Sequence, residues 1–110
     1  MENIDINKLL QDMLATAKGE FNNYWKEVKP YAETEFKSFI ENLILIEKLK
    51  IEGKMTEEKA LLHIDMQKNS MRMVFLTIEG LGILAVQNAI NSVIDVIRTT
   101  VNTALGWTIL

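Results

Sequence analysis

Hydrophobic residues recur at helical spacing along almost the whole chain and predict an all-α protein. One such face begins after Asp5, the expected N-cap, and contains Leu9, Leu10, Met13 and Leu14. A second stripe follows Pro30 and comprises Ala32, Phe36, Phe39, Ile40, Leu43, Ile44 and Ile46. Residues 6–52 are therefore expected to form a first helical arm. Pro30 should bend this arm, because proline removes a backbone hydrogen bond and clashes with the preceding turn.

A tight turn at residues 53–56 is expected to end the first arm. Gly53 suits the left-handed position after a helix, and Thr56 followed by two glutamates suits the N-cap of a new helix. A second arm should run from about 57 to 105. Its first half has an apolar side that contains Leu61, Ile64, Met71, Phe75 and Ile78. On another side a charged residue recurs every seven positions and predicts a solvated or inter-helix stripe: Glu58, Asp65, Arg72 and Glu79.

The last third of the chain is its most apolar part. It follows Gly80 and Gly82, which should bend or break the second arm because glycine costs about 1 kcal/mol in a helix interior relative to alanine. Its broad apolar face, which cannot be left in water, comprises Ile83, Val86, Ile90, Val93, Ile94, Ile97 and Val101. Polar residues recur on the same helix at intervals of three and four: Asn88, Asn91, Asp95, Arg98 and Asn102. Two interpretations stay open, side-chain hydrogen bonds that fix register in an oligomer, or an ordinary solvated face.

The two arms predict a long antiparallel helical hairpin with matched kinks near Pro30 and Gly80/Gly82. Pro30 lies 24 residues before Lys54, in the turn, and Gly80 lies 26 residues after it. The two expected kinks would therefore lie side by side, at nearly the same distance from the turn. Straight arms would run roughly 70 Å at about 1.5 Å per residue, and a lone hairpin of that length buries too little apolar surface. Residues 1–110 should therefore form a single helical domain. It would be a four-helix bundle made within one chain or, as the favoured alternative, by dimerisation or larger assembly.

Composition and charge narrow the class of protein. The formal net charge is −3, hydrophobic residues make up 48% of the chain, and there is no cysteine. These values argue against disorder and exclude disulfides and thiolate metal sites. Without a basic cluster, no nucleic-acid partner is expected. The acidic start of the chain lacks the basic and apolar regions of a secretory signal, so a cytoplasmic location is expected.

No pattern predicts an enzyme, a cofactor or a small-molecule substrate. Residues 80–85 fit the Gly-x-Gly-x-x-Ala form of a dinucleotide-binding turn, but the chain lacks the sheet and the ribose-binding acid that this motif requires. His63 is the only histidine, and Ala60 stands where a di-iron helical bundle needs a glutamate. Glu79, an acid within an apolar run, is expected at an exposed edge or paired with a lysine of the first arm.

The predicted function is that of a non-enzymatic helical assembly protein that self-associates through its apolar C-terminal helix. The interface is expected to comprise Phe36, Phe39, Leu43, Phe75, Ile90, Ile94, Ile97, Asn88, Asn91 and Asn102. The main alternative is a membrane-active or membrane-peripheral protein that exposes the 80–110 helix to a bilayer, with Trp107 as an interfacial anchor. Its uncharged run of 15 residues is short of the ~20 that a membrane span needs. A metal- or ligand-binding bundle is a lesser alternative.

Overall fold

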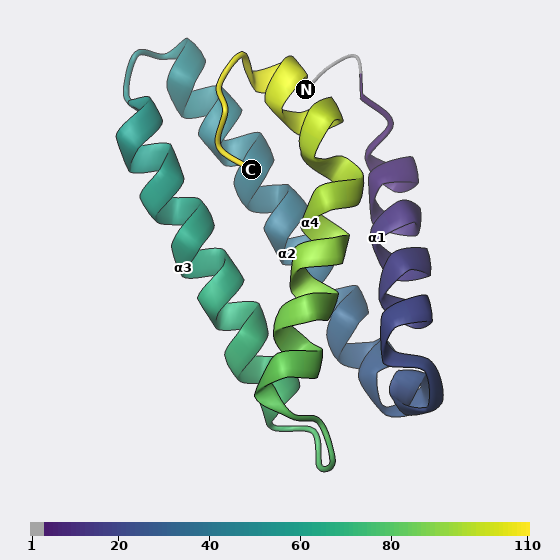
Figure 1. Cartoon of the computed structure of the whole chain (residues 1–110). Coiled ribbons are helices and arrows are strands. Elements are labelled where there is room, and N and C mark those ends of the chain that lie inside the picture. Colours follow the sequence, from purple (N-terminus) through teal and green to yellow (C-terminus); the bar gives the residue numbers. More distant parts are fainter. Residues whose placement is uncertain (1–3) are drawn as a thin grey trace.

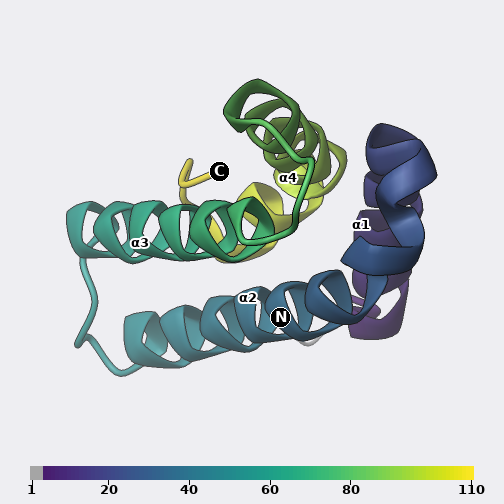
Figure 2. The same cartoon turned by 90° about the horizontal axis from the view of Figure 1, so that it is seen from below.

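Four α-helices form a ring around one apolar core in residues 4–110, the part of the chain that the structure describes (Figure 1). The structure is a computed structural model. Its helices are α1 (Ile6–Phe21), α2 (Trp25–Ile51), α3 (Glu57–Leu76) and α4 (Ile83–Leu105), with a short 3-10 turn, η1 (Asn22–Tyr24), between α1 and α2. Each helix packs against the two beside it, in the order α1, α2, α3, α4 and back to α1 (Figure 2). The predicted all-α class is confirmed, and the four helices come together within one chain.

Two of the predicted capping residues begin helices as expected. The Asp5 carboxylate accepts a hydrogen bond from the Lys8 N–H at 3.1 Å, and Thr56 Oγ1 accepts one from the Lys59 N–H at 3.2 Å. These bonds satisfy amide groups that the first turn of a helix leaves without an internal partner. After α2, Gly53 takes a φ of +73°, a left-handed conformation that glycine adopts without the steric cost of a Cβ. The chain thereby reverses between α2 and α3.

The predicted bend near Pro30 lies elsewhere. Pro30 is inside α2, and the first arm turns at Asn22–Tyr24, six to eight residues earlier. Asn22 takes a φ of +51°, a left-handed conformation that asparagine tolerates better than most residues. Pro30 stands in the second turn of α2, where its fixed φ is compatible with a helix and its missing N–H removes one hydrogen bond. The helix absorbs this loss, so the asparagine rather than the proline sets the position of the turn.

The second arm breaks at the predicted glycines, between Leu76 and Ile83. Gly80 has a φ of +92°, and a Cβ at this position would lie 2.9 Å from Tyr24 Cε1. Tyr24 therefore packs directly on the Gly80 backbone, and the α1–α2 and α3–α4 turns meet at one end of the bundle, the lower end in Figure 1. Because the chain folds back at both turns, its longest extent is 44 Å, well short of the ~70 Å of a straight hairpin.

All four helices contribute side chains to the core, and no polar or charged side chain of residues 4–110 is buried in it. The largest share comes from α4, which buries Val86, Ala89, Ile90, Val93, Ile94, Ile97, Val101 and Leu105. Phe75 of α3 connects three helices, because its ring centroid lies 5.4 Å from that of Phe21 in α1 and 6.1 Å from that of Phe36 in α2. The most extensive pairing joins α1 to α4. The predicted apolar face of α4 is thus buried inside one chain from Val86 to Val101, whereas Ile83, its first residue, is 68% exposed.

Candidate interaction surface

The seven apolar residues predicted for self-association lie in the core of the single chain. Their side chains are at most 3% exposed: Phe36, Phe39, Leu43, Phe75, Ile90, Ile94 and Ile97. The prediction of an interface assumed that one neighbouring arm could not cover the apolar face of the last helix. The chain instead supplies three other helices around the same core, so the face is covered without a second copy. In the single chain these side chains therefore lie in the core and not on its surface.

The polar residues of α4 do not act as one surface. Asn88 and Asn91 are exposed to solvent, and Arg98 forms an ion pair with Asp95 one turn earlier. These contacts fit the interpretation of an ordinary solvated face. Asn102 differs from the other two asparagines because it is half-buried and contacts the segment that follows α4.

The segment of residues 106–110 folds back over α4, and we call it the C-terminal clasp. Asn102 Oδ1 accepts hydrogen bonds from the N–H groups of Ile109 at 3.1 Å and Leu110 at 3.0 Å. The Ile109 side chain is buried in the core. From the start of α3, the Glu57 carboxylate accepts a hydrogen bond from the Thr108 N–H at 3.3 Å. Asn102 therefore has an intramolecular role, which the sequence pattern had assigned to an oligomer.

Lys50, near the end of α2, holds the start of the C-terminal clasp. Its Nζ donates a hydrogen bond to the Leu105 carbonyl, one of the last carbonyls of α4, and lies 4.6 Å from the centre of the Trp107 ring. A cation at this position satisfies an orphan carbonyl and complements the negative end of the helix dipole. Gly106 turns the chain here with a φ of +71°. Trp107 is half-buried against the protein in this arrangement.

The residues considered for chemistry do not come together. His63 and Glu79 are both exposed, and no group of three histidine, aspartate or glutamate side chains within residues 4–110 could hold a metal ion. Residues 80–85 connect two helices rather than a strand and a helix, so they lack the context of a dinucleotide-binding turn. Burial raises the pKa of the Glu35 carboxyl above its usual range. Desolvation of one carboxyl is insufficient to define an acid–base site, which needs a second group beside it.

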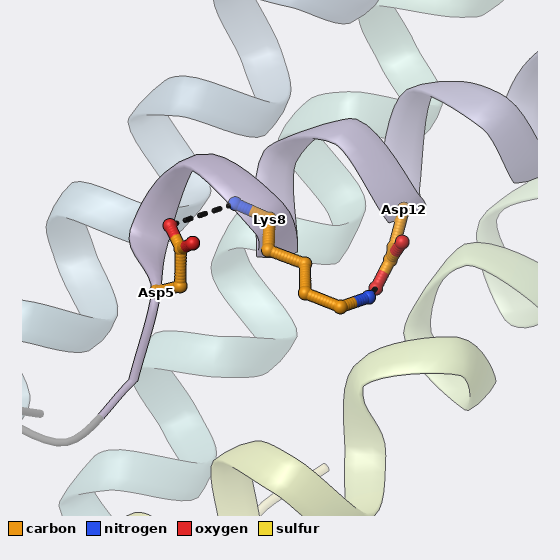
Figure 3. Close-up of polar contacts among 3 residues, drawn as sticks. All are labelled: Asp5, Lys8 and Asp12. Atoms are coloured by element: carbon orange, nitrogen blue, oxygen red, sulfur yellow. Dashed lines mark hydrogen bonds and ion pairs between the residues drawn. The ribbon is translucent and has the colours of Figure 1, made fainter.

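The hollows on the surface are open to solvent, and one of about 490 Å³ lies along the polar side of α2 beside Glu33, Lys37 and Glu41. One of about 180 Å³ lies beside the first turn of α1 and is lined by Ile4, Asp5, Lys8, Leu9, Asp12 and Thr100. Figure 3 shows that Lys8 engages both aspartates, through its backbone N–H with Asp5 and through its ammonium group, 3.0 Å from Asp12 Oδ2. A helix cap and an i,i+4 ion pair explain this cluster. Another hollow, of about 250 Å³, lies where Tyr24 meets Gly80 between the two turns.

The exposed apolar side chains in the middle of α3 form a stripe on its outer face. Leu62, Met66 and Met73 are 63%, 66% and 70% exposed. At 3.6 residues per turn these three positions fall within roughly 40° of one another around the helix, opposite the buried side chains. The buried face consists of Ala60, Ile64, Met71 and Phe75. α3 therefore has two apolar faces, one in the core and one in solvent.

The outer stripe has the spacing of a coiled-coil contact. Leu62, Met66, Asn69 and Met73 recur at intervals of four, three and four, and we call these four residues the α3 seam. Polar residues border both sides of the seam, with Glu58, Asp65 and Arg72 along one edge and His63 and Ser70 along the other. In total, α3 has three acidic and three basic residues, so its surface charge is balanced.

Sequence reasoning missed the α3 seam because it sought one apolar face on each helix. The interval pattern from Leu62 to Met73 was visible, and so was the heptad recurrence of the charged edge. Neither signal states which of two apolar faces is in the core. The exposed fractions of Leu62 and Ile64, 63% and 1%, decide between them.

The fold defines a class, that of small all-α proteins in which four helices enclose one apolar core. Comparison of the chain with protein-family models, with curated proteins and with solved structures finds no match. No helix of residues 4–110 combines the length and the apolar character needed to cross a membrane. A role for the protein must therefore be inferred from its own surface.

Proposed function

We propose that this chain is a non-enzymatic helical assembly protein that self-associates through the α3 seam. The observation that carries the proposal is the exposure of Leu62, Met66 and Met73 in the middle of a helix whose other face already completes the core. Fully burying a leucine or methionine side chain contributes about 1.5 to 3 kcal/mol. A symmetric pair of copies buries the same three side chains twice, which helps to offset the rotational and translational freedom lost on association.

The proposal moves the contact from α4 to α3. From Val86 onward the apolar face of α4 is buried within the chain, whereas the α3 seam is accessible without any opening of the fold. Bordering polar residues suit a helix partner, since a coiled-coil seam places apolar residues at the centre and charged residues at its edges. The proposal requires no cofactor, nucleic acid or small-molecule substrate. The cysteine-free sequence is compatible with a cytoplasmic location, which forms part of the same proposal.

A membrane-peripheral role has less support. Helices that lie in an anionic membrane surface carry an excess of lysine and arginine on their polar face. The helix considered for the bilayer, α4, instead has one charge of each sign, Asp95 and Arg98. The charges of α3 are also balanced, three acidic against three basic. Trp107, the anchor considered for the bilayer, is engaged by Lys50.

Sedimentation velocity at micromolar to millimolar concentrations tests the proposal. The mass should rise from the 12.6 kDa of one chain toward at least twice that value. Met66→Lys places a charge in the centre of the α3 seam and should abolish the rise. Ile51→Lys is the matched control, because Ile51 is 79% exposed at the end of α2 and outside the seam. Circular dichroism of both variants checks that they fold.

Two results would contradict the proposal. One is a mass of a single chain at every concentration of the unmodified protein. The other is equal loss of association in the folded Met66→Lys and Ile51→Lys variants, which would mean that an added charge anywhere on the surface prevents the contact.

A further inference from the structure

The α3 seam requires a partner helix with matching spacing, and a second copy of α3 provides one. Leu62, Met66, Asn69 and Met73 alternate between the two kinds of core position in a heptad. In a coiled coil each such side chain inserts among four side chains of the facing helix, so both helices must repeat at the same interval. An identical helix meets this condition by construction.

The charged edge of the seam indicates how the two helices run. In a parallel pair the two different edges face each other, which places Asp65 near Ser70 and Glu58 near His63 of the second copy and forms no pair of carboxylate with lysine or arginine. In an antiparallel pair each edge faces its own counterpart. Asp65 then faces Arg72 of the second copy, and Arg72 faces Asp65 of the second copy. A single two-fold axis generates both ion pairs.

The register that aligns these charges also aligns the apolar side chains. With Leu62 opposite Met73 of the second copy, Met66 falls opposite Asn69 of the second copy, because numbering rises along one helix as it falls along the other. The same register sets Asp65 beside Arg72. One register therefore sets Leu62 opposite Met73 and Asp65 beside Arg72, while Asn69 lies opposite Met66.

Arg72 is already oriented toward the seam in the single chain. Its Nη1 donates a hydrogen bond to Asn69 Oδ1 at 3.1 Å, which ties the edge residue to a seam residue of the same helix. The Arg72 side chain is half-buried, so its position is restricted before any partner arrives. In the antiparallel register Asn69 lies opposite Met66, so this polar core position lowers the stability of the pair.

From these observations we infer that α3 pairs antiparallel with α3 of a second copy, with Asp65 of each chain beside Arg72 of the other. This inference rests on the proposed function and specifies the geometry of that association. α3 is about 30 Å long, so the contact lies at the small end of specific interfaces. The association is therefore weak and depends on concentration.

Spin labels on single cysteines distinguish the two orientations, and the chain has no cysteine of its own. Ser70→Cys and Glu58→Cys place labels near the middle and near the start of α3. In the antiparallel register the two copies of residue 70 are offset by roughly 8 Å along the helix axis and the two copies of residue 58 by roughly 30 Å. Electron–electron distance measurement should therefore give a short distance for the first label and a long one for the second. Adding Met66→Lys to Ser70→Cys should remove the short distance.

The outcomes separate the inference from the proposed function. Short distances for both labels would establish a parallel pair, which overturns the inference and leaves self-association through the seam intact. A dimer whose Ser70→Cys distance is long, or survives Met66→Lys, would place the contact on another surface and overturn both. A chain that stays monomeric but binds another helical protein through the seam would refute the second copy as partner.

The ion pairs have an independent test. Asp65→Lys replaces both predicted attractions with repulsions and should raise the dimer dissociation constant by about tenfold at low salt, with a smaller effect at high salt. Glu41→Lys is the control, because it changes the net charge equally at an exposed position of α2. Equal weakening by the two variants would attribute the effect to net charge and contradict the pairing of Asp65 with Arg72.

Discussion

The neighbouring helices α3 and α4 distribute their apolar side chains in different ways. α4 is the more apolar helix, and its eight buried residues lie on one broad face that the rest of the chain covers. α3 divides fewer apolar residues between a buried face and an exposed one, so that Met66 is 66% exposed while Ile64, two residues earlier, is 1% exposed. The comparison teaches that the angular distribution of apolar side chains around a helix, more than their number, decides how many of them stay exposed.

Truncating one side chain on each helix should give the largest contrast. Ile97→Ala in α4 removes buried methyl groups and leaves a cavity, which should lower the free energy of unfolding by about 2 to 5 kcal/mol. Met66→Ala in α3 should change it by less than about 0.5 kcal/mol at concentrations where the protein is monomeric. Urea unfolding followed by circular dichroism measures both values. Comparable losses would contradict the assignment of the two faces.

The turn that joins the two helices should respond to a substitution at Gly80. Gly80→Ala combines a φ of +92° with a Cβ 2.9 Å from Tyr24, so it should lower the free energy of unfolding by about 1 to 3 kcal/mol. Gly82→Ala is the control, because Gly82 has a φ of −90° and open space around its Cα. Thermal and urea unfolding should show little change for it. A similar loss in both variants would mean that the Tyr24 contact has no special importance.

The C-terminal clasp should give the smallest effect. Lys50→Met removes the hydrogen bond to the Leu105 carbonyl and the cation beside Trp107, which should cost about 1 kcal/mol. Amide hydrogen exchange should become faster in the last turn of α4 before it changes elsewhere. Lys54→Met is the control, because Lys54 is exposed and its ion pair with Glu52 is long, at 3.9 Å. Unchanged exchange in α4 would show that Lys50 does not secure the clasp.

The parts of the fold that single residues decide could be predicted from the sequence. Asp5 and Thr56 cap helices as expected, Gly53 takes the expected left-handed conformation, and the second arm breaks at Gly80 and Gly82. The effect of Pro30 was misjudged because a proline weakens a helix by an amount that the rest of the helix can absorb. In each of these cases the decisive physics is local.

The parts that depend on distant contacts could not be predicted. An amphipathic face must be buried, but its pattern is the same whether another helix of the chain or a second copy covers it. The seven core residues predicted as an interface reflect this ambiguity. The bond from Lys50 to Leu105 joins residues 55 apart in sequence, and no periodicity predicts such a contact.

The pairing of α1 with α4 has a consequence for how the chain folds. The most extensive contact in the ring joins the first helix to the last, side by side in Figure 1. Contacts between segments so far apart in sequence carry the largest loop-closure entropy, so we expect them to form late, after the local α2–α3 hairpin. Until the ring closes, α4 has too few neighbours to cover its apolar face. We therefore expect the chain to fold as one cooperative unit, in which the contact of α1 with α4 completes the core.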